Sequence, residues 1–296
     1  MNGKQAEGCL KNFEEWGRCK VLGLMMDFQA IYGIDFSGAK DTGNKIWITK
    51  GVPEGGKILV TKCLKARDLP SSGRLLEACL PSLVNLINSN RNAAFGLDFP
   101  FGLPASLVKK KGWEEFILNF PNRFNDPDDF KVTCFSEARN RELKRKTDND
   151  ARTPFSAYNL RLYKQTYYGI SEILFPLVRY KSACILPFHR PKSGKLWILE
   201  ICPASTLRSL ELNGIPYKGR EKTHKENRGK ILKQMEWKCP VIVRKTEIRK
   251  KILENHGGDA LDSVIAAIAT FNALKNEDSL IPDDDGLWKI EGHIYV

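Results

Sequence analysis

The 296-residue sequence lacks the patterns that mark several common protein classes. It has no GxxxxGK[ST] loop, no GxGxxG after an apolar run and no GxSxG, which weighs against P-loop NTPases, dinucleotide enzymes and α/β-hydrolases. No apolar run reaches the roughly 18 residues of a membrane helix. The eight cysteines form no CxxC pair, so a zinc site is not expected. Most of them have apolar neighbours, as in a reduced, cytoplasmic protein.

The composition favours a folded chain with a polyanionic partner. Apolar residues make up 42% of the sequence, which is enough for a sizeable core. Lys and Arg total 47 against 35 Asp and Glu, a formal charge of +12 that favours nucleic acid as a partner. We expect a flexible N-terminal extension over 1–28, one domain over 29–275 and a C-terminal tail over 276–296.

The first hundred residues predict four strands and a helix. Apolar runs over 31–37, 45–51 and 57–66 are separated by short polar or glycine-rich segments, which favours an antiparallel meander. Residues 71–90 place leucines at helical spacing. Residues 93–98 form a nearly all-apolar run, as expected of a strand buried on both faces.

The rest of the chain predicts a helical insertion followed by further strands and helices. Residues 104–180 are charged and carry no obvious strand, so a mostly helical insertion is expected. Strands are expected again over 182–189 and 195–203, joined as a hairpin. Three helices are then expected, over 204–213, 225–237 and 257–274.

Acidic residues recur where apolar elements begin or end. Asp35 and Asp98 each end an apolar run, Glu200 interrupts a third, and Asp259 opens the last helix. Asp262 lies one turn later on the same helix face. Several buried carboxylates without an adjacent arginine require cations, and oxygen-only ligands suit Mg²⁺ or Mn²⁺. The pattern predicts a divalent-metal site, although each residue taken singly has a simpler interpretation as a turn residue or helix cap.

The order of elements, with carboxylates on the first and fourth strands and on the last helix, resembles the ribonuclease H-like fold. More specifically, the sequence resembles the family called domain of unknown function 429, whose members are described as predicted nucleases of that fold. The motifs are GIDFSGAK (33–40), GLDFPFGLP (96–104), WILEICPAS (197–205), GGDALDSVIAA (257–267) and, similar to some members, DARTPFSAYNLRLYKQTYYGI (150–170). The resemblance covers about residues 31–272. It implies an α/β fold with a mixed five-stranded sheet flanked by helices.

The resemblance also implies roles for individual residues. Asp35 would be the first-strand metal ligand, shared by two ions, and Asp98 the fourth-strand ligand. Asp259 matches the acid that opens the last helix of resolvase-like members, and His256 matches their histidine. Glu200 and Asp262 would be additional ligands. His256 is a candidate general acid or proton shuttle, and capping of the last helix is an equal alternative.

Basic and polar residues are candidates for substrate contacts. Ser37 and Lys40, in the turn after the first strand, can face a phosphate. Arg161 and Lys164 are interleaved with tyrosines over 158–168, a composition that can stack unpaired bases beside cations. A solvated lysine and a tyrosine stripe packed inside the insertion are the simpler interpretations.

These observations favour a nuclease that hydrolyses phosphodiester bonds with Mg²⁺ or Mn²⁺ held by carboxylates. Two such ions about 4 Å apart can activate water and stabilise the leaving oxygen. An inactive ribonuclease H-like module that binds nucleic acid or protein is the first alternative. An actin-like ATPase or sugar kinase is a weaker one, because the chain shows no duplicated halves. The sequence gives no indication of oligomeric state.

Overall fold

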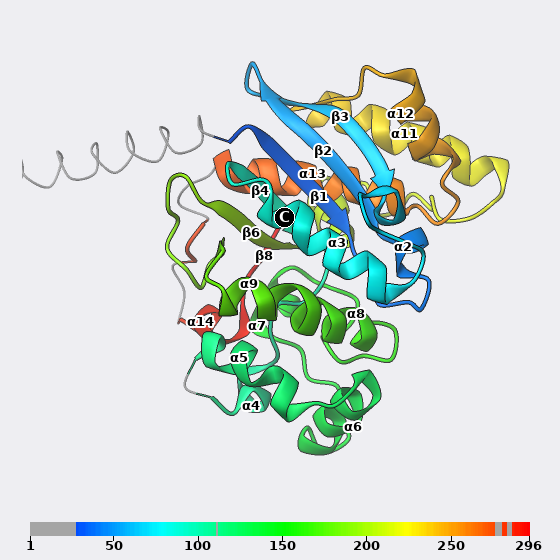
Figure 1. Cartoon of the computed structure of the whole chain (residues 1–296). Coiled ribbons are helices and arrows are strands. Elements are labelled where there is room, and N and C mark those ends of the chain that lie inside the picture. The colour runs from blue at the N-terminus through cyan, green and yellow to red at the C-terminus, as the bar shows by residue number, and fades with distance from the viewer. Residues whose placement is uncertain (1–27, 111, 276–279, 283–285) are drawn as a thin grey trace, which may run out of the picture.

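A mixed β-sheet forms the centre of the chain in the computed structural model, which describes residues 28–110, 112–275, 280–282 and 286–296 (Figure 1). The predicted N-terminal extension lies outside these ranges except for its last residue. The predicted antiparallel meander and the parallel pairing of the fourth strand with the first are both present. The five central strands, in spatial order, are β3 (Lys57–Lys65), β2 (Trp47–Glu54), β1 (Ala30–Asp35), β4 (Ala93–Leu97) and β6 (Leu196–Ile201).

The sheet has eight strands, so the prediction of five was wrong. β7 (Val241–Ile242) extends the sheet beyond β3, and β5 (Ala183–Ile185) extends it beyond β6. β8 (Ile294–Tyr295), within the segment predicted to be a tail, also pairs with β6. Strands of two or three residues carry too little alternation to be found from a sequence pattern.

The predicted hairpin between the strands near 182–189 and 195–203 was also wrong. β5 and β6 are parallel, with Ala183 opposite Leu196. The chain therefore returns through residues 186–195 before β6 begins. The sequence pattern locates both strands but carries no information on their relative direction.

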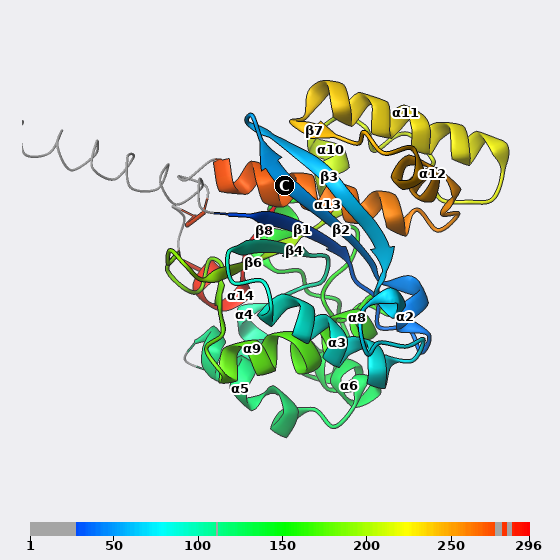
Figure 2. The same ribbon diagram turned by 45° about the horizontal axis from the view of Figure 1, so that its top comes forward.

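Helices cover both faces of the sheet, giving three layers (Figures 1 and 2). None of the helices in the described ranges is both long and apolar enough to cross a membrane. One face carries α10 (Pro203–Ser209), α11 (Lys222–Lys238), α12 (Thr246–Glu254) and α13 (Asp259–Lys275). The other face carries α3 (Leu76–Asn88) and the insertion.

The insertion is mostly helical, as predicted. Its last long helix runs through α8 and α9 with a π-helical segment between them. Shorter helices lie both within the insertion and in other parts of the chain. The insertion contains α4 (Ala105–Val108), α5 (Trp113–Arg123), α6 (Pro127–Glu137), α7 (Lys146–Asp150), α8 (Tyr163–Tyr168), the π-helical segment Gly169–Leu174 and α9 (Phe175–Arg179). Elsewhere lie α2 (Thr42–Lys45), a 3-10 helix (Ala66–Asp68) and α14 (Trp288–Glu291).

Two glycines allow α13 to lie directly on the sheet. Gly33 of β1 and Gly96 of β4 are partners in the parallel register. A Cβ atom at Gly33 would lie 2.1 Å from the backbone nitrogen of Ala267, and one at Gly96 would lie 1.9 Å from Oγ1 of Thr270. Only glycine permits this approach of helix to strand. The two glycines therefore fix the position of α13 over β1 and β4.

We expect Gly33→Ala to lower the free energy of unfolding by about 1–3 kcal/mol, the usual cost of overpacking a core. The added methyl group would push α13 away from β1, because its nearest neighbours are backbone atoms. Urea denaturation measures the loss. Gly214→Ala is the matched control, since nothing lies within 4 Å of a Cβ there. Equal stability of the two variants would contradict the close packing of α13.

Candidate active site

Two aspartates lie side by side where β1 and β4 end. Asp35 is the last residue of β1, and the N–H of Asp98, just after β4, donates to the carbonyl of Ile34 (3.0 Å). Side chains alternate along a strand, so both carboxyls point to the same face as Gly33 and Gly96, toward α13. The two carboxyls are close enough for each to influence the pKa of the other. Both residues remain partly exposed to solvent.

A third carboxylate, Asp262, comes from α13 and is held by two residues of the loop before α11. The Tyr217 hydroxyl donates to Oδ1 of Asp262 (2.6 Å), and the Lys218 Nζ lies 2.7 Å from Oδ2. The Asp262 side chain is 3% exposed, whereas that of Lys218 is 58% exposed. Tyr217 and Lys218 open a basic stretch, residues 217–230, whose charge indicates a candidate phosphate contact, but the sequence does not indicate that they lie beside Asp262.

Burial and mutual repulsion raise the pKa values of the clustered carboxyls. Burial, and then the charges of Asp262, Asp98 and Asp259, raise the pKa of Asp35 well above its usual value. Burial and then Asp262 raise the pKa of Asp98 to about 8, although the charge of Lys218 opposes this. The three carboxyls thus have the one ammonium group of Lys218 nearby to neutralise them. Protonation of a carboxyl relieves the excess negative charge.

This proton uptake predicts how the stability of the metal-free protein changes with pH. The pKa of Asp98 rises from 3.8 to about 8 on folding, so between these values the folded chain holds a proton that the unfolded chain releases. The stabilisation that this proton gives the folded chain is fully present below pH 3.8 and is lost as the pH rises through about 8. We expect the unfolding temperature in EDTA to fall across this range, and Asp98→Asn to flatten the fall. Identical pH profiles for both proteins would contradict the assignment.

Asp259 and His256 line a neighbouring cavity of about 540 Å³. Asp259 is still close enough to contribute to the raised pKa of Asp35. His256 is exposed, and the cleft that Asp98 and Asp262 line does not include it. The cavity is rich in cations, with Lys45, Lys65, Arg220 and Lys251 among its lining residues.

Glu200 lines the same cleft as Asp98 and Asp262 and adds to the raised pKa of Asp98, but its side chain lies on the other face of the sheet. Its neighbours Leu199 and Ile201 pack into the core beside α13, so Glu200 faces the insertion on the opposite side of the sheet. There its carboxylate accepts from Arg145 at 2.5 and 2.9 Å, and Arg145 also bonds to Asp148 at 2.8 Å. An adjacent arginine, which the sequence analysis did not expect, thus neutralises Glu200. We leave Glu200 out of the proposed ligand set.

A cleft of about 290 Å³ opens beside Asp98 and Asp262, whereas Asp35 does not line it. Glu200, Lys218 and residues of the insertion, including Arg161, also line this cleft. The Gln165 side chain donates to the backbone carbonyl of Asp98 and ties the insertion to the end of β4. The predicted substrate residue Arg161 therefore faces the carboxylate cleft.

Three of the four predicted substrate residues gather beside this cleft. Ser37, Arg161 and Lys164 line an adjoining cavity of about 350 Å³. Gly38 makes the arrangement possible, because a Cβ there would lie 2.4 Å from the Lys164 carbonyl group. Lys40 is exposed on the same turn and lines neither cavity.

The carboxylate oxygens of the aspartates are suitable ligands for a hard divalent cation, but in this structure they interact with other groups. Within the described residues, no group of three or more His, Cys, Asp or Glu side chains is already arranged to hold a metal ion. Asp35 and Asp98 have raised pKa values, which favour bound protons, and the Lys218 ammonium group pairs with Asp262. An ion could replace a proton and this ammonium group, since carboxylate oxygens are the ligands that Mg²⁺ and Mn²⁺ prefer.

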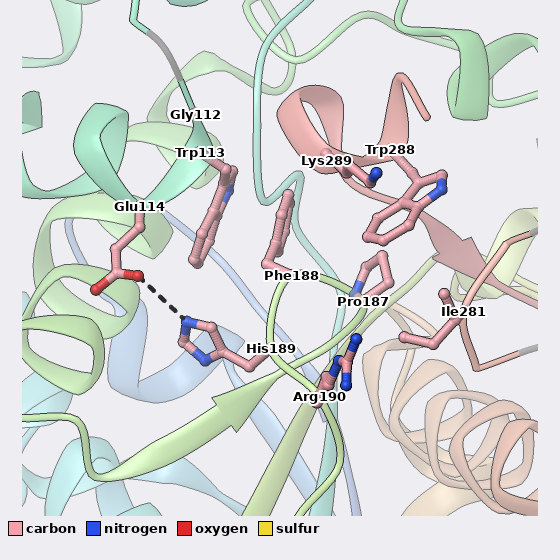
Figure 3. A pocket seen from close by; sticks show the side chains of 10 residues that line it. All are labelled: Gly112, Trp113, Glu114, Pro187, Phe188, His189, Arg190, Ile281, Trp288 and Lys289. Atoms are coloured by element: carbon pink, nitrogen blue, oxygen red, sulfur yellow. Dashed lines mark ion pairs between the residues drawn. The ribbon is translucent and has the colours of Figure 1, made fainter. Parts of the chain in front are cut away.

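A separate cavity of about 550 Å³ lies at the insertion and has a different character (Figure 3). The Trp113 and Phe188 rings stack with centroids 3.8 Å apart. Oε2 of Glu114 lies 3.9 Å from Nε2 of His189. None of the predicted site residues lines this cavity, and Glu114 is the carboxylate among its lining residues. It does not have the carboxylate cluster on which the metal hypothesis depends.

No family model, curated protein or solved structure matches the chain. The function of the site is therefore argued from the chemistry of its own residues.

Proposed function

We propose that the chain is a divalent-metal-dependent nuclease that hydrolyses phosphodiester bonds of nucleic acid. The observation that carries the proposal is the proximity of Asp35, Asp98 and Asp262, the last two of which line one cleft, with more negative charge than the adjacent Lys218 neutralises. Buried carboxylates that repel one another are costly unless protons or cations compensate them. Mg²⁺ or Mn²⁺ would compensate them at neutral pH.

The proposal includes a ribonuclease H-like fold and a relationship to the domain of unknown function 429 family. The spatial order of the five central strands supports it, with an antiparallel meander followed by two parallel strands. Asp35 on the first strand and Asp98 after the fourth also occupy the positions that the resemblance implies. The three short edge strands are additions to that arrangement.

Each residue of the site would have a distinct role. Asp35, Asp98 and Asp262 would hold the ion, with Asp259 close enough to contribute charge. A bound Mg²⁺ or Mn²⁺ supplies Lewis-acid stabilisation of charge on the phosphate and lowers the pKa of water. Lys218, once released from Asp262, would bind a phosphate oxygen at the mouth of the cleft.

The residues around the cleft would position the ligands and the substrate. The Tyr217 hydroxyl would keep Asp262 oriented through its 2.6 Å hydrogen bond. Arg161 and Lys164 would bind flanking phosphates of the strand, a contribution that weakens as salt rises. The cations of the neighbouring cavity that His256 lines would extend this contact to the other side of the aspartates.

A nucleic-acid-binding module without catalytic activity is the second candidate. The ion pair of Lys218 with Asp262 favours it, because an internal ammonium group already neutralises one of the three carboxylates. In such a module, binding would not depend on a metal ion. The two candidates therefore differ in their response to divalent cations.

Addition of a divalent cation to metal-free protein tests the proposal. We expect Mg²⁺ or Mn²⁺ to raise the unfolding temperature, because an ion that binds only the folded state stabilises it. The same ions should start cleavage of labelled DNA or RNA, and EDTA should stop it. Nucleic-acid binding without any effect of the ions on unfolding or cleavage would favour the binding module.

A further inference from the structure

We infer that the cleft accepts an unpaired nucleotide and excludes base-paired duplex. This inference rests on the proposed nuclease function and adds the class of substrate. It follows from the position of the insertion, from the size of the cleft and from the side chains opposite the aspartates.

The insertion packs directly against the two strand ends that carry the aspartates. At the end of β1, the backbone of Gly38 approaches Lys164 so closely that a Cβ would lie 2.4 Å from its carbonyl group. After β4, a Cβ at Gly169 would lie 2.4 Å from the ring of Phe99, next to Asp98. The contact of Gly38 with Lys164 is between backbones and cannot open by rotation of a side chain, and the Phe99 ring beside Gly169 is buried. The insertion therefore forms a fixed wall over the aspartates.

The cleft that this wall leaves is small. Its volume of about 290 Å³ lies near the lower end of the ~300–1,000 Å³ that small-molecule sites span. Asp98 and Asp262 line it from the sheet and α13. A cube of this volume is only about 7 Å on a side, whereas the major groove of a duplex alone is about 12 Å wide, so both strands cannot enter together. A phosphate can reach the aspartates only on a strand that enters alone.

The insertion contributes to the lining of the cleft an aromatic ring and a cation suited to an unpaired base. Phe155 and Arg161 both line the cleft, and the guanidinium carbon of Arg161 lies 5.5 Å from the centroid of the Phe155 ring. Sites for single strands combine aromatic stacking with cations along the backbone. A base on Phe155 would leave its phosphate between Arg161 and Lys218, which lines the other side of the cleft.

Cleavage and binding of matched substrates test the inference. One labelled oligonucleotide would be presented with Mn²⁺ as a single strand, as a blunt duplex and as a duplex with a single-stranded overhang, beside a dinucleotide. We expect the single strand and the overhang to be cut at least about a hundredfold faster than the blunt duplex, because unpairing has a free-energy cost. If the dinucleotide alone were cleaved, the site would take a small ligand and not a nucleic-acid strand, which would also overturn the inference. Duplex cleavage at the rate of the single strand would overturn the inference and leave the nuclease proposal intact.

Binding in EDTA tests the same inference without any cleavage. We expect fluorescence anisotropy to show tighter binding of the single strand than of the duplex. Phe155→Leu keeps apolar bulk but removes the stacking face, and it should weaken single-strand binding about five- to a hundredfold. Trp237→Leu is the control, since that side chain on α11 is 84% exposed and away from the cleft. Unchanged single-strand affinity in Phe155→Leu would overturn the role of the ring.

Discussion

Asp35→Asn is expected to abolish metal-dependent cleavage and to stabilise the metal-free protein. Asp35 interacts with Asp262, Asp98 and Asp259 and has a raised pKa, so its charge destabilises the folded chain in the absence of an ion. The amide keeps the shape of the side chain and removes that repulsion. It also removes a proposed ligand, and a metal ion supplies several kcal/mol of transition-state stabilisation. The rate should fall at least about a thousandfold.

Cleavage rates and urea denaturation in EDTA measure the two effects on the same protein. Glu200→Gln is the matched control, because Glu200 is an acid near the end of a strand and lines the same cleft as Asp98 but pairs with Arg145. That variant should retain metal-dependent cleavage and lose stability. If Glu200→Gln abolished cleavage while Asp35→Asn did not, the assignment of the proposed ligands would be refuted.

Arg145→Leu is expected to lower the free energy of unfolding by about 3–5 kcal/mol, the usual cost of breaking a buried ion pair. Arg145 is fully buried between Glu200 and Asp148, and it also donates to the carbonyl of Glu291 at 3.0 Å. Its removal would leave two buried carboxylates without a counter-charge. The same side chain joins β6, the insertion and the segment before β8, so their packing should loosen together.

Urea denaturation compares this variant with Arg67→Leu. Arg67 forms an ion pair with Asp68 at 3.5 Å, but both side chains are about half exposed. An exposed pair contributes only about 0–1 kcal/mol, so this control should stay close to the wild type. A loss in Arg145→Leu as small as that in Arg67→Leu would contradict the structural role of the buried network.

The larger elements of the fold could be predicted from the sequence because their patterns are long. The runs that form β1 and β4, and the apolar α13, each extend over five or more residues. The short strands β5, β7 and β8 could not be found in this way, and local patterns do not encode whether two strands are parallel. The antiparallel meander was predicted correctly because its connections are short enough to fix the strand direction.

The aspartates at the strand ends could be predicted, whereas their surroundings could not. Asp35 and Asp98 were expected together, and the structure joins them. Glu200 follows an apolar run as Asp35 and Asp98 do, but its side chain lies on the other face of the sheet. Which face a side chain occupies depends on the register of its strand. Tyr217 and Lys218 come from a loop that approaches Asp262 only in the folded chain. The metal ion, the nucleic-acid partner and the cytoplasmic location stay predictions.

Gly33 and Gly96 are needed for the fold, because α13 packs closely on them. The neighbouring Asp35 and Asp98 are needed instead for the proposed chemistry. Each glycine precedes an aspartate by two residues, yet the two positions meet different physical requirements. A duplicated gene that exchanged Asp35 and Asp98 would still encode a folded, even more stable, protein without the proposed reaction. The glycines would remain in such a descendant, because their replacement displaces the helix. A relative that has both glycines but lacks the aspartates is therefore expected to have the same fold, and its activity should be tested separately.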